Sequence, residues 1–207
     1  FNLYPRQFVP TVPPEMILMG RVLYHMSAWA RAIVVPLAVV QALDPDGRPV
    51  PDGFTIDELF VPGVSKDFHH ADGFFSWKSF FLGADKLFKF WERHGISSIR
   101  SRAIEQCKQW ILDRTRYTDG LAAIYPPMMY TIMALDLLGC PPGDPDRDEA
   151  EQQFLNLMVD DGERFFFQPC FSVVWDTAIA AHALAEAGTA PADSLDRAAA
   201  WLISKEV

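Results

Sequence analysis

The sequence predicts an all-α protein, and three observations on its 207 residues point that way. Apolar residues return every three or four positions over most long segments, which is the period of an amphipathic helix. Glycine and serine stand where helices of that length would end or begin. Alternation of apolar and polar residues is nowhere convincing; the best candidate for a strand, 164–167, is very short.

The first third of the chain predicts one helix between two irregular segments. Residues 1–14 contain four prolines, which favour an extended arm. Ser27 suits the N-cap of a helix over 28–43, within which Pro36 favours a kink. Residues 44–67 are rich in Pro, Gly and Asp and have no sustained period, so they predict a long loop.

Residues 72–93 predict an aromatic amphipathic helix. Its apolar stripe carries Phe74, Trp77, Phe81, Phe88 and Trp91. Its opposite face carries Lys78, Asp85, Lys89 and Glu92. Composition alone favours an ordinary core helix with the aromatic face packed inside. The alternative is a helix that lies in a membrane interface with this face among the acyl chains.

The rest of the chain predicts five more helices. Their expected ranges are 98–115, 127–138, 147–158, 173–187 and 195–205. Their expected end signals are Gly95, Gly139 and Gly188 as stops, and Ser97 or Ser98 and Ser194 as N-caps.

These helices recur in a fixed order. Asp119–Gly120 and Asp161–Gly162 lie 42 residues apart, and each leads through a proline into a helix. The pattern Trp-x-x-Ala-Ile begins at Trp29 and again at Trp175. Periods of this size predict stacked helical hairpins, none of which can bury its apolar face alone. The periodicity is compatible with both an open solenoid and a closed α/α barrel.

Composition excludes several classes of protein. Half of the residues are hydrophobic, which excludes a disordered chain. The net charge of −9 argues against a nucleic-acid partner. The longest nearly apolar run, 32–43, is shorter than the roughly 20 residues that cross a bilayer. The chain opens on Phe1 and ends at Val207 inside an expected helix, so we expect a segment of a longer protein.

Cysteine and histidine usage predicts neither a disulfide framework nor a metal site. Cys107, Cys140 and Cys170 are odd in number and widely spaced, which favours reduced thiols in a cytosolic compartment. His69–His70 has no third ligand at a suitable spacing, so we expect no metal.

Four segments stand in one order along the chain: VPPE at 12–15, SAWARA at 27–32, DGLAAIYP at 119–126 and QPCFSVVWDTA at 168–178. Together they resemble the squalene–hopene cyclase family of triterpene cyclases, over nearly the whole chain. Two positions depart from the usual pattern, where Ala122 replaces glycine and Val173 replaces proline. The resemblance implies that 1–207 is an internal segment of a cyclase α/α barrel, with 160–207 at the start of a second barrel domain.

The resemblance implies a reaction as well. The family encloses an apolar cavity between two α/α barrel domains, lies on the membrane as a monotopic protein, and converts squalene to hopene and hopanol without a cofactor. An Asp-x-Asp-Asp motif protonates the substrate, and aromatic faces stabilise the carbocations that follow. This motif does not occur in the 207 residues and is expected after Val207, so this segment should not cyclise squalene alone. The full-length protein is expected on the cytoplasmic side of the membrane, with a homodimer as one form.

Residue by residue, the resemblance implies three sets of contacts. The substrate-binding set is Trp29, Ile124, Tyr125, Pro126, Tyr130, Cys170, Phe171, Trp175 and Asp176. The channel set is Met26 and Val34, and the membrane-contact set is Phe74, Trp77, Phe80 and Phe81. From the residues alone, a tryptophan that starts an apolar helix belongs to the core more often. Asp176 is equally explained as a first-turn carboxylate favoured by the helix dipole.

Two other functions stay open at this point. One is a non-catalytic helical-repeat module that binds a hydrophobic isoprenoid ligand. The other is a prenyltransferase-type subunit, which shares the α/α barrel but requires a zinc site for which the sequence offers no ligands.

Overall fold

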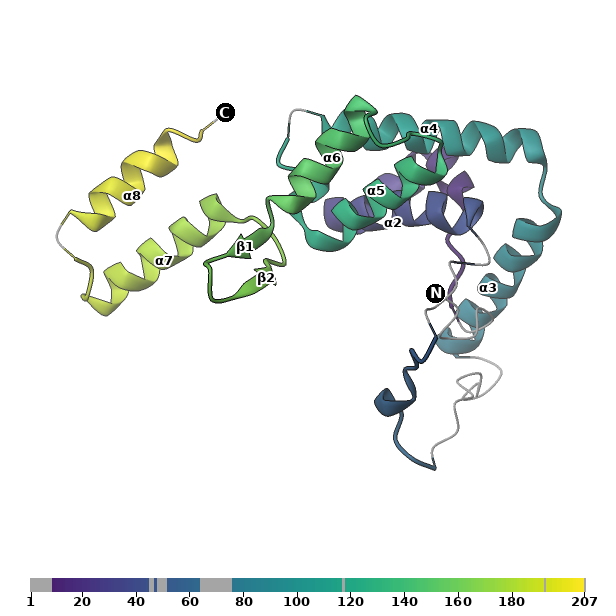
Figure 1. Cartoon of the computed structure of the whole chain (residues 1–207), viewed down its shortest axis with the longest axis horizontal. Coiled ribbons are helices and arrows are strands. Elements are labelled where there is room, and N and C mark those ends of the chain that lie inside the picture. The colour runs from purple at the N-terminus through teal and green to yellow at the C-terminus, as the bar shows by residue number, and fades with distance from the viewer. Residues whose placement is uncertain are drawn as a thin grey trace. The chain divides into compact units, whose positions relative to one another are not determined.

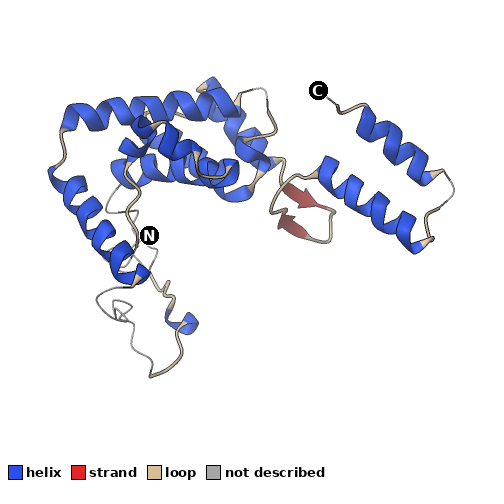
Figure 2. Cartoon of the chain, turned by 180° about the vertical axis from the view of Figure 1, so that it is seen from behind, coloured by secondary structure: helices blue, strands red, loops and turns tan. Residues whose placement is uncertain are grey.

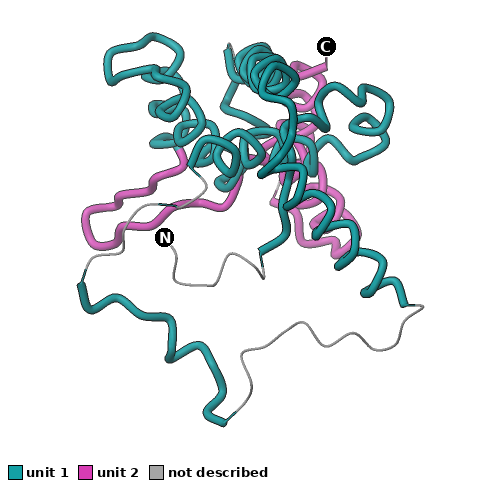
Figure 3. Tube along the Cα trace, turned by 90° about the vertical axis from the view of Figure 1, so that its right-hand side faces the viewer, with its two compact units in different colours: residues 1–156 teal, residues 157–207 magenta. Residues whose placement is uncertain are grey.

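The computed structural model describes residues 9–44, 47, 52–63, 76–116, 118–191 and 193–206, and most of them are helical (Figure 1). This confirms the all-α class. The chain divides into two compact units, residues 1–156 and residues 157–207, which are coloured separately in Figure 3.

The first unit consists of helices around an aliphatic core. Its helices are α1 (Arg21–Tyr24), α2 (Ala28–Leu43), α3 (Trp77–His94), α4 (Ser97–Thr115), α5 (Tyr125–Leu137) and α6 (Pro145–Leu155). Short 3-10 turns cover Pro14–Met19, Asp57–Leu59 and Leu121–Ala123. The helix α2 packs against both α4 and α5, and α6 packs against α5. The core between them is made by Leu23, Ala32, Val35, Val39, Cys107, Trp110, Ile111, Leu121 and Ala134.

The helix α2 covers the predicted residues, because Ser27 caps its first turn and Pro36 does not interrupt it. The Ser27 hydroxyl accepts a hydrogen bond from the Ala30 amide at 3.2 Å, which satisfies one of the amides left free in the first turn. Pro36 lies inside the helix without ending it, and its ring is buried. The helix tolerates this proline because packing of its buried face offsets the lost backbone hydrogen bond.

Several predicted helix ends are wrong by one to three residues. The N-cap of α4 is Ile96, whose carbonyl accepts from the Ile99 and Arg100 amides, so neither Ser97 nor Ser98 caps it. Asp193, in a left-handed conformation, precedes α8, and Ser194 is already helical. Gly95 does end α3 as predicted, but in an extended rather than a left-handed conformation.

Other end signals are confirmed, and one helix is displaced. Gly188 ends α7 in the left-handed conformation, and Gly139 has a positive φ just after α5. The helix α6 begins at Pro145 instead of 147, because the Asp144 carboxylate accepts from the Asp146 and Arg147 amides.

The second unit contains a hairpin, shown in red in Figure 2. Its second strand lies within 164–167, the best strand candidate of the sequence, but its first strand was not predicted. Strands β1 (Met158–Asp160) and β2 (Phe165–Phe167) pair antiparallel, with Met158 opposite Phe167. The prediction of a helix through 158 is therefore wrong. The Asp161 carboxylate closes the turn by accepting from the Glu163 and Arg164 amides at 3.0 and 2.7 Å. The helices α7 (Val173–Ala187) and α8 (Ser194–Ile203) follow and pack on each other.

Candidate functional site

The first turn of α2 presents an exposed tryptophan. The side chain of Trp29 is 68% exposed, whereas that of Trp110, in the core against the same helix, is 8% exposed. The core interpretation of Trp29 is therefore wrong within its unit. Met26, one of the two expected channel residues, packs against the core, and Val34 is half-buried. The structure thus brings Met26 and Trp29 to the same end of α2.

The segment that leads into α5 carries four of the expected substrate-binding residues. Ile124 is extended and serves as the N-cap of α5, and its carbonyl accepts from the Met128 amide at 3.2 Å. Pro126 lies in the first turn, where its missing N–H is not needed. The Tyr125 ring lies 4.9 Å from that of Phe154 in α6, centre to centre. Tyr130 is half-buried one turn further along.

A strained turn shapes this segment. Gly120 has φ 98° and ψ 163°, a conformation that residues with a Cβ rarely adopt, and a Cβ here would also displace the flexible Met128 methyl group, which would lie 2.4 Å away. Ala122 and Ala123 have φ values of 57° and 50°, which cost a residue with a Cβ about 1 kcal/mol or more each. Ala122 is the position where the resemblance leads us to expect glycine, and the positive φ explains why glycine is favoured there.

In the second unit, the remaining expected residues flank the start of α7. Trp175 is 69% exposed, while Cys170 and Phe171 are half-buried. Asp176 is exposed, and its carboxylate accepts from the Ser172 hydroxyl at 2.6 Å. This contact fits the interpretation of Asp176 as a first-turn carboxylate. Because Trp29 and Trp175 belong to different units, one cavity lined by both stays a prediction.

The helix α3 presents its aromatic face outward. Trp77, Phe80 and Phe81 are all exposed and contact one another, with ring centres 5.4–6.2 Å apart. The expected contact residue Phe74 lies outside the described residues. On the opposite face, half-buried Asp85 accepts a hydrogen bond from the Thr11 amide at 2.8 Å and pairs with Lys89, whereas Lys78 is exposed. The core interpretation of this aromatic face is therefore wrong for the described part of the helix.

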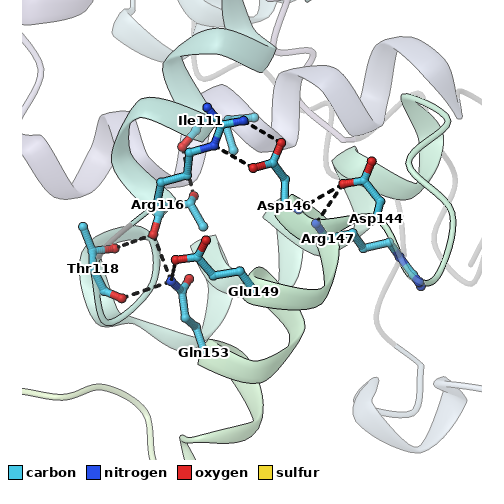
Figure 4. A network of polar contacts seen from close by, with 9 residues as sticks. Ile111, Arg116, Thr118, Asp144, Asp146, Arg147, Glu149 and Gln153 are labelled. Carbon is cyan, nitrogen blue, oxygen red and sulfur yellow. Dashed lines mark hydrogen bonds and ion pairs between the residues drawn. The ribbon is translucent and has the colours of Figure 1, made fainter.

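A polar network that sequence reasoning missed joins α6 to the end of α4 (Figure 4). Arg116 forms two hydrogen bonds with the Asp146 carboxylate, at 2.6 and 2.7 Å, and this pairing lowers the pKa of Asp146. The Gln153 amide nitrogen donates to the backbone carbonyls of Thr115 and Thr118 and to Glu149. The only available signal was a basic residue just after one helix and an acidic residue at the start of another.

The core contains one strongly perturbed thiol. Burial, together with the nearby charge of Glu15, raises the pKa of Cys107 to about 12. The Cys107 thiol is thus protonated and inert, which marks it as a packing residue and not a nucleophile.

The described residues contain neither a candidate metal site nor a candidate membrane-spanning helix. No three His, Cys, Asp or Glu side chains in the described ranges are grouped so that they could hold a metal ion. Likewise, no helix within those ranges combines the length and the hydropathy needed to cross a bilayer.

Comparisons with known proteins agree on one family. Residues 1–163 match the family model described as the squalene-hopene cyclase N-terminal domain. The squalene–hopene cyclase of Zymomonas mobilis is 36% identical over 218 aligned residues, which cover all of this chain and 33% of that protein. Dammaradiene synthase of Dryopteris crassirhizoma is 32% identical over 205 aligned residues, which cover 96% of this chain and 30% of that protein. The chain therefore spans about a third of the length of these curated relatives.

Proposed function

We propose, from the premise that this chain belongs to the squalene–hopene cyclase family, that it forms part of the wall of a cavity in which squalene is folded and cyclised. The reaction is proposed for a whole protein of which this chain is one part, since the chain spans about a third of its relatives. The proton donor, an Asp-x-Asp-Asp motif, lies outside these residues, and no cofactor takes part.

The observation that carries this proposal is the exposure of Trp29. The helix that bears it is well packed, and Ala32 and Val35 of the same helix are buried. A large aromatic surface left in water on such a helix costs about 25 cal/mol per Å² relative to burial. A ring that faces a substrate cavity accounts for this cost, because an aromatic face attracts a carbocation without offering a nucleophile. Exclusion of water from the cavity keeps the cation from being quenched.

The other residues of the expected site have supporting roles in this proposal. Trp175 and Asp176 contribute from the start of α7, and Cys170 and Phe171 lie just before them. Ile124, Pro126 and Tyr130 line the wall near α5, while Tyr125 fixes its shape by packing on Phe154. Met26 and Val34 border the channel by which the substrate enters.

The membrane is the source of the substrate in this proposal. The exposed aromatic face of α3, made by Trp77, Phe80 and Phe81, lies in the interface of the cytoplasmic leaflet and holds the protein as a monotopic enzyme. Net negative charge gives no attraction to anionic lipids, so attachment rests on apolar burial. The helical hairpins close into an α/α barrel, and the protein forms a homodimer.

Product analysis of the complete protein tests the cyclisation proposal. Purified protein in detergent, given squalene, should yield pentacyclic products, and Trp175→Ala should shift them towards partially cyclised ones. Val174→Ala, on the same helix but about 100° away around its axis, is the matched control. No cyclic product from the unmodified protein would overturn the proposal; wild-type products from Trp175→Ala would remove Trp175 from the site.

Vesicle binding tests the membrane proposal separately. Phe80→Ser together with Phe81→Ser should weaken sedimentation with neutral vesicles about tenfold or more, since two large apolar groups lose their burial. Leu59→Ala, an exposed apolar residue outside α3, is the control. Unchanged sedimentation of the double variant would contradict a membrane role for α3.

A further inference from the structure

The segment that joins α1 to α2 is held by one arginine. Arg31, the fourth residue of α2, turns its guanidinium back onto this segment. Its Nη1 donates to the carbonyl oxygen of Met26 and, at 3.4 Å, to that of Tyr24. Because α1 ends at Tyr24, these carbonyls lack partners in a following turn, and a charged donor satisfies them strongly.

Tyr24 connects this arginine to the core of the unit. The guanidinium carbon of Arg31 lies 4.7 Å from the centre of the Tyr24 ring, over its face. The Tyr24 hydroxyl accepts a hydrogen bond from Arg114 Nη2 at 3.1 Å, and the Arg114 guanidinium lies 4.2 Å from the centre of the Trp110 ring. Since Trp110 is buried, a continuous series of contacts links the first turn of α2 to α4.

Trp29 lies in the turn that these contacts hold. Its ring is largely exposed, so neighbouring side chains of its own unit do little to fix it. Its position therefore depends on the backbone of residues 26–31. Two devices hold that backbone: the Ser27 cap inside the turn, and the Arg31 contacts that tie the turn to the residues before it.

We infer that Arg31 is a positioning residue for Trp29, acting through the Met26 and Tyr24 carbonyls and the Tyr24 ring. The effect of Arg31 on cyclisation rests on the proposed function; its effect on the position of the ring does not. Arginine suits the task because its planar guanidinium donates to two carbonyls through Nη1 and stacks on an aromatic face at once. Lysine, a compact point charge, can replace only part of this arrangement.

Fluorine NMR of the complete protein, labelled with 5-fluorotryptophan, tests the inference without relying on activity. The Trp29 resonance is identified by its disappearance in Trp29→Phe. Arg31→Gln should shift or broaden this resonance, and Arg31→Lys should do so less. Arg102→Gln, at an exposed arginine of α4, removes the same charge and should leave the resonance unchanged. An unchanged Trp29 resonance in folded Arg31→Gln overturns the inference, whatever the activity.

Kinetics then separate this inference from the proposed function. With squalene, kcat/KM of Arg31→Gln should fall about tenfold, since a displaced positioning group commonly costs that much or more. The share of early-terminated products should rise, and Arg31→Lys should restore part of the loss. A moved resonance with unchanged products in both Arg31→Gln and Trp29→Phe upholds positioning and removes Trp29 from the cavity. Should Arg31→Gln fail to fold, Tyr24→Leu removes the ring beneath the guanidinium and is judged by the same resonance.

Discussion

The helices α2 and α7 begin with the same Trp-x-x-Ala-Ile pattern, yet they differ completely in packing. The helix α2 buries Ala32, Val35 and Val39 against α4 and α5. The helix α7, fully described, buries none of its residues, and within its unit it packs mainly on α8. The pattern therefore predicts a helix with an apolar face, and the neighbours decide whether that face is covered.

This difference changes what an exposed tryptophan means. On α7, Trp175 is exposed together with Val174 and Ile179, so its exposure says little about function. On α2, Trp29 stays exposed although the same helix is deeply packed. Trp29 is the most exposed large apolar residue of α2, where only Leu43 at the other end is also exposed, and this makes Trp29 the stronger support for a cavity.

The largest expected effect concerns thiol reactivity in the two units. Burial raises the pKa of Cys107 to about 12, so at pH 8 its thiolate is about a thousandfold scarcer than for an ordinary cysteine. In single-cysteine variants of the complete protein, Cys107 should react with a disulfide reagent far more slowly than half-buried Cys170. Equal rates would show that the core around α4 opens readily. Because the folded pKa is raised, the stability that the neutral thiol contributes is present below about pH 8.5 and declines as pH rises towards 12.

The next largest effect is the loss of unfolding free energy when a packed side chain is shortened. Ile111→Ala should lower the free energy of unfolding by about 2–5 kcal/mol, because this fully buried side chain would leave a cavity in the core. Ile179→Ala on α7 makes the same chemical change at an exposed position and should cost about 0.5 kcal/mol or less. Urea unfolding of both variants checks the comparison. An equal loss for Ile179→Ala in the complete protein would mean that another segment covers α7, and the contrast between the two helices would disappear.

The same contrast shows what sequence could predict here. Both α2 and α7 occupy the predicted residues, because caps such as Ser27 and Gly188 and an apolar period are local signals. The second strand of the hairpin lies within 164–167, the best strand candidate of the sequence, whereas the first strand was missed because turn closure by the Asp161 carboxylate overrides the helical period before it. For α3, composition alone favoured a buried aromatic face, and only the resemblance led us to expect Trp77, Phe80 and Phe81 outside; the Thr11–Asp85 contact on the other face joins residues far apart in sequence.

The candidate site was less accessible to sequence reasoning than the fold. Periodicity placed Trp29 and Trp175 at helix starts but favoured burial for both, and only the resemblance assigned them to a cavity. The strained backbone at Ala122 and the role of Arg31 depend on φ angles and on contacts between turns. Neither the composition nor the periodicity of this sequence indicates the strained backbone at Ala122 or the contacts of Arg31.

The smallest expected effect is the loss of stability when an ion pair is removed from each unit. Arg116–Asp146 is bidentate and partly covered, whereas Arg197–Asp193 is an exposed pair within one helix end. Asp146→Asn should therefore cost about 1 kcal/mol at pH 7, and Asp193→Asn close to nothing. The pKa of Asp146 is lowered in the folded state, so its contribution is full above the unfolded-state pKa of about 3.9 and is lost as pH falls through the lower, folded value. Thermal melts of both variants between pH 2 and pH 7 would show the cost of Asp146→Asn shrinking only at the acid end; a cost that stays constant with pH would mean that the pair is not ionic.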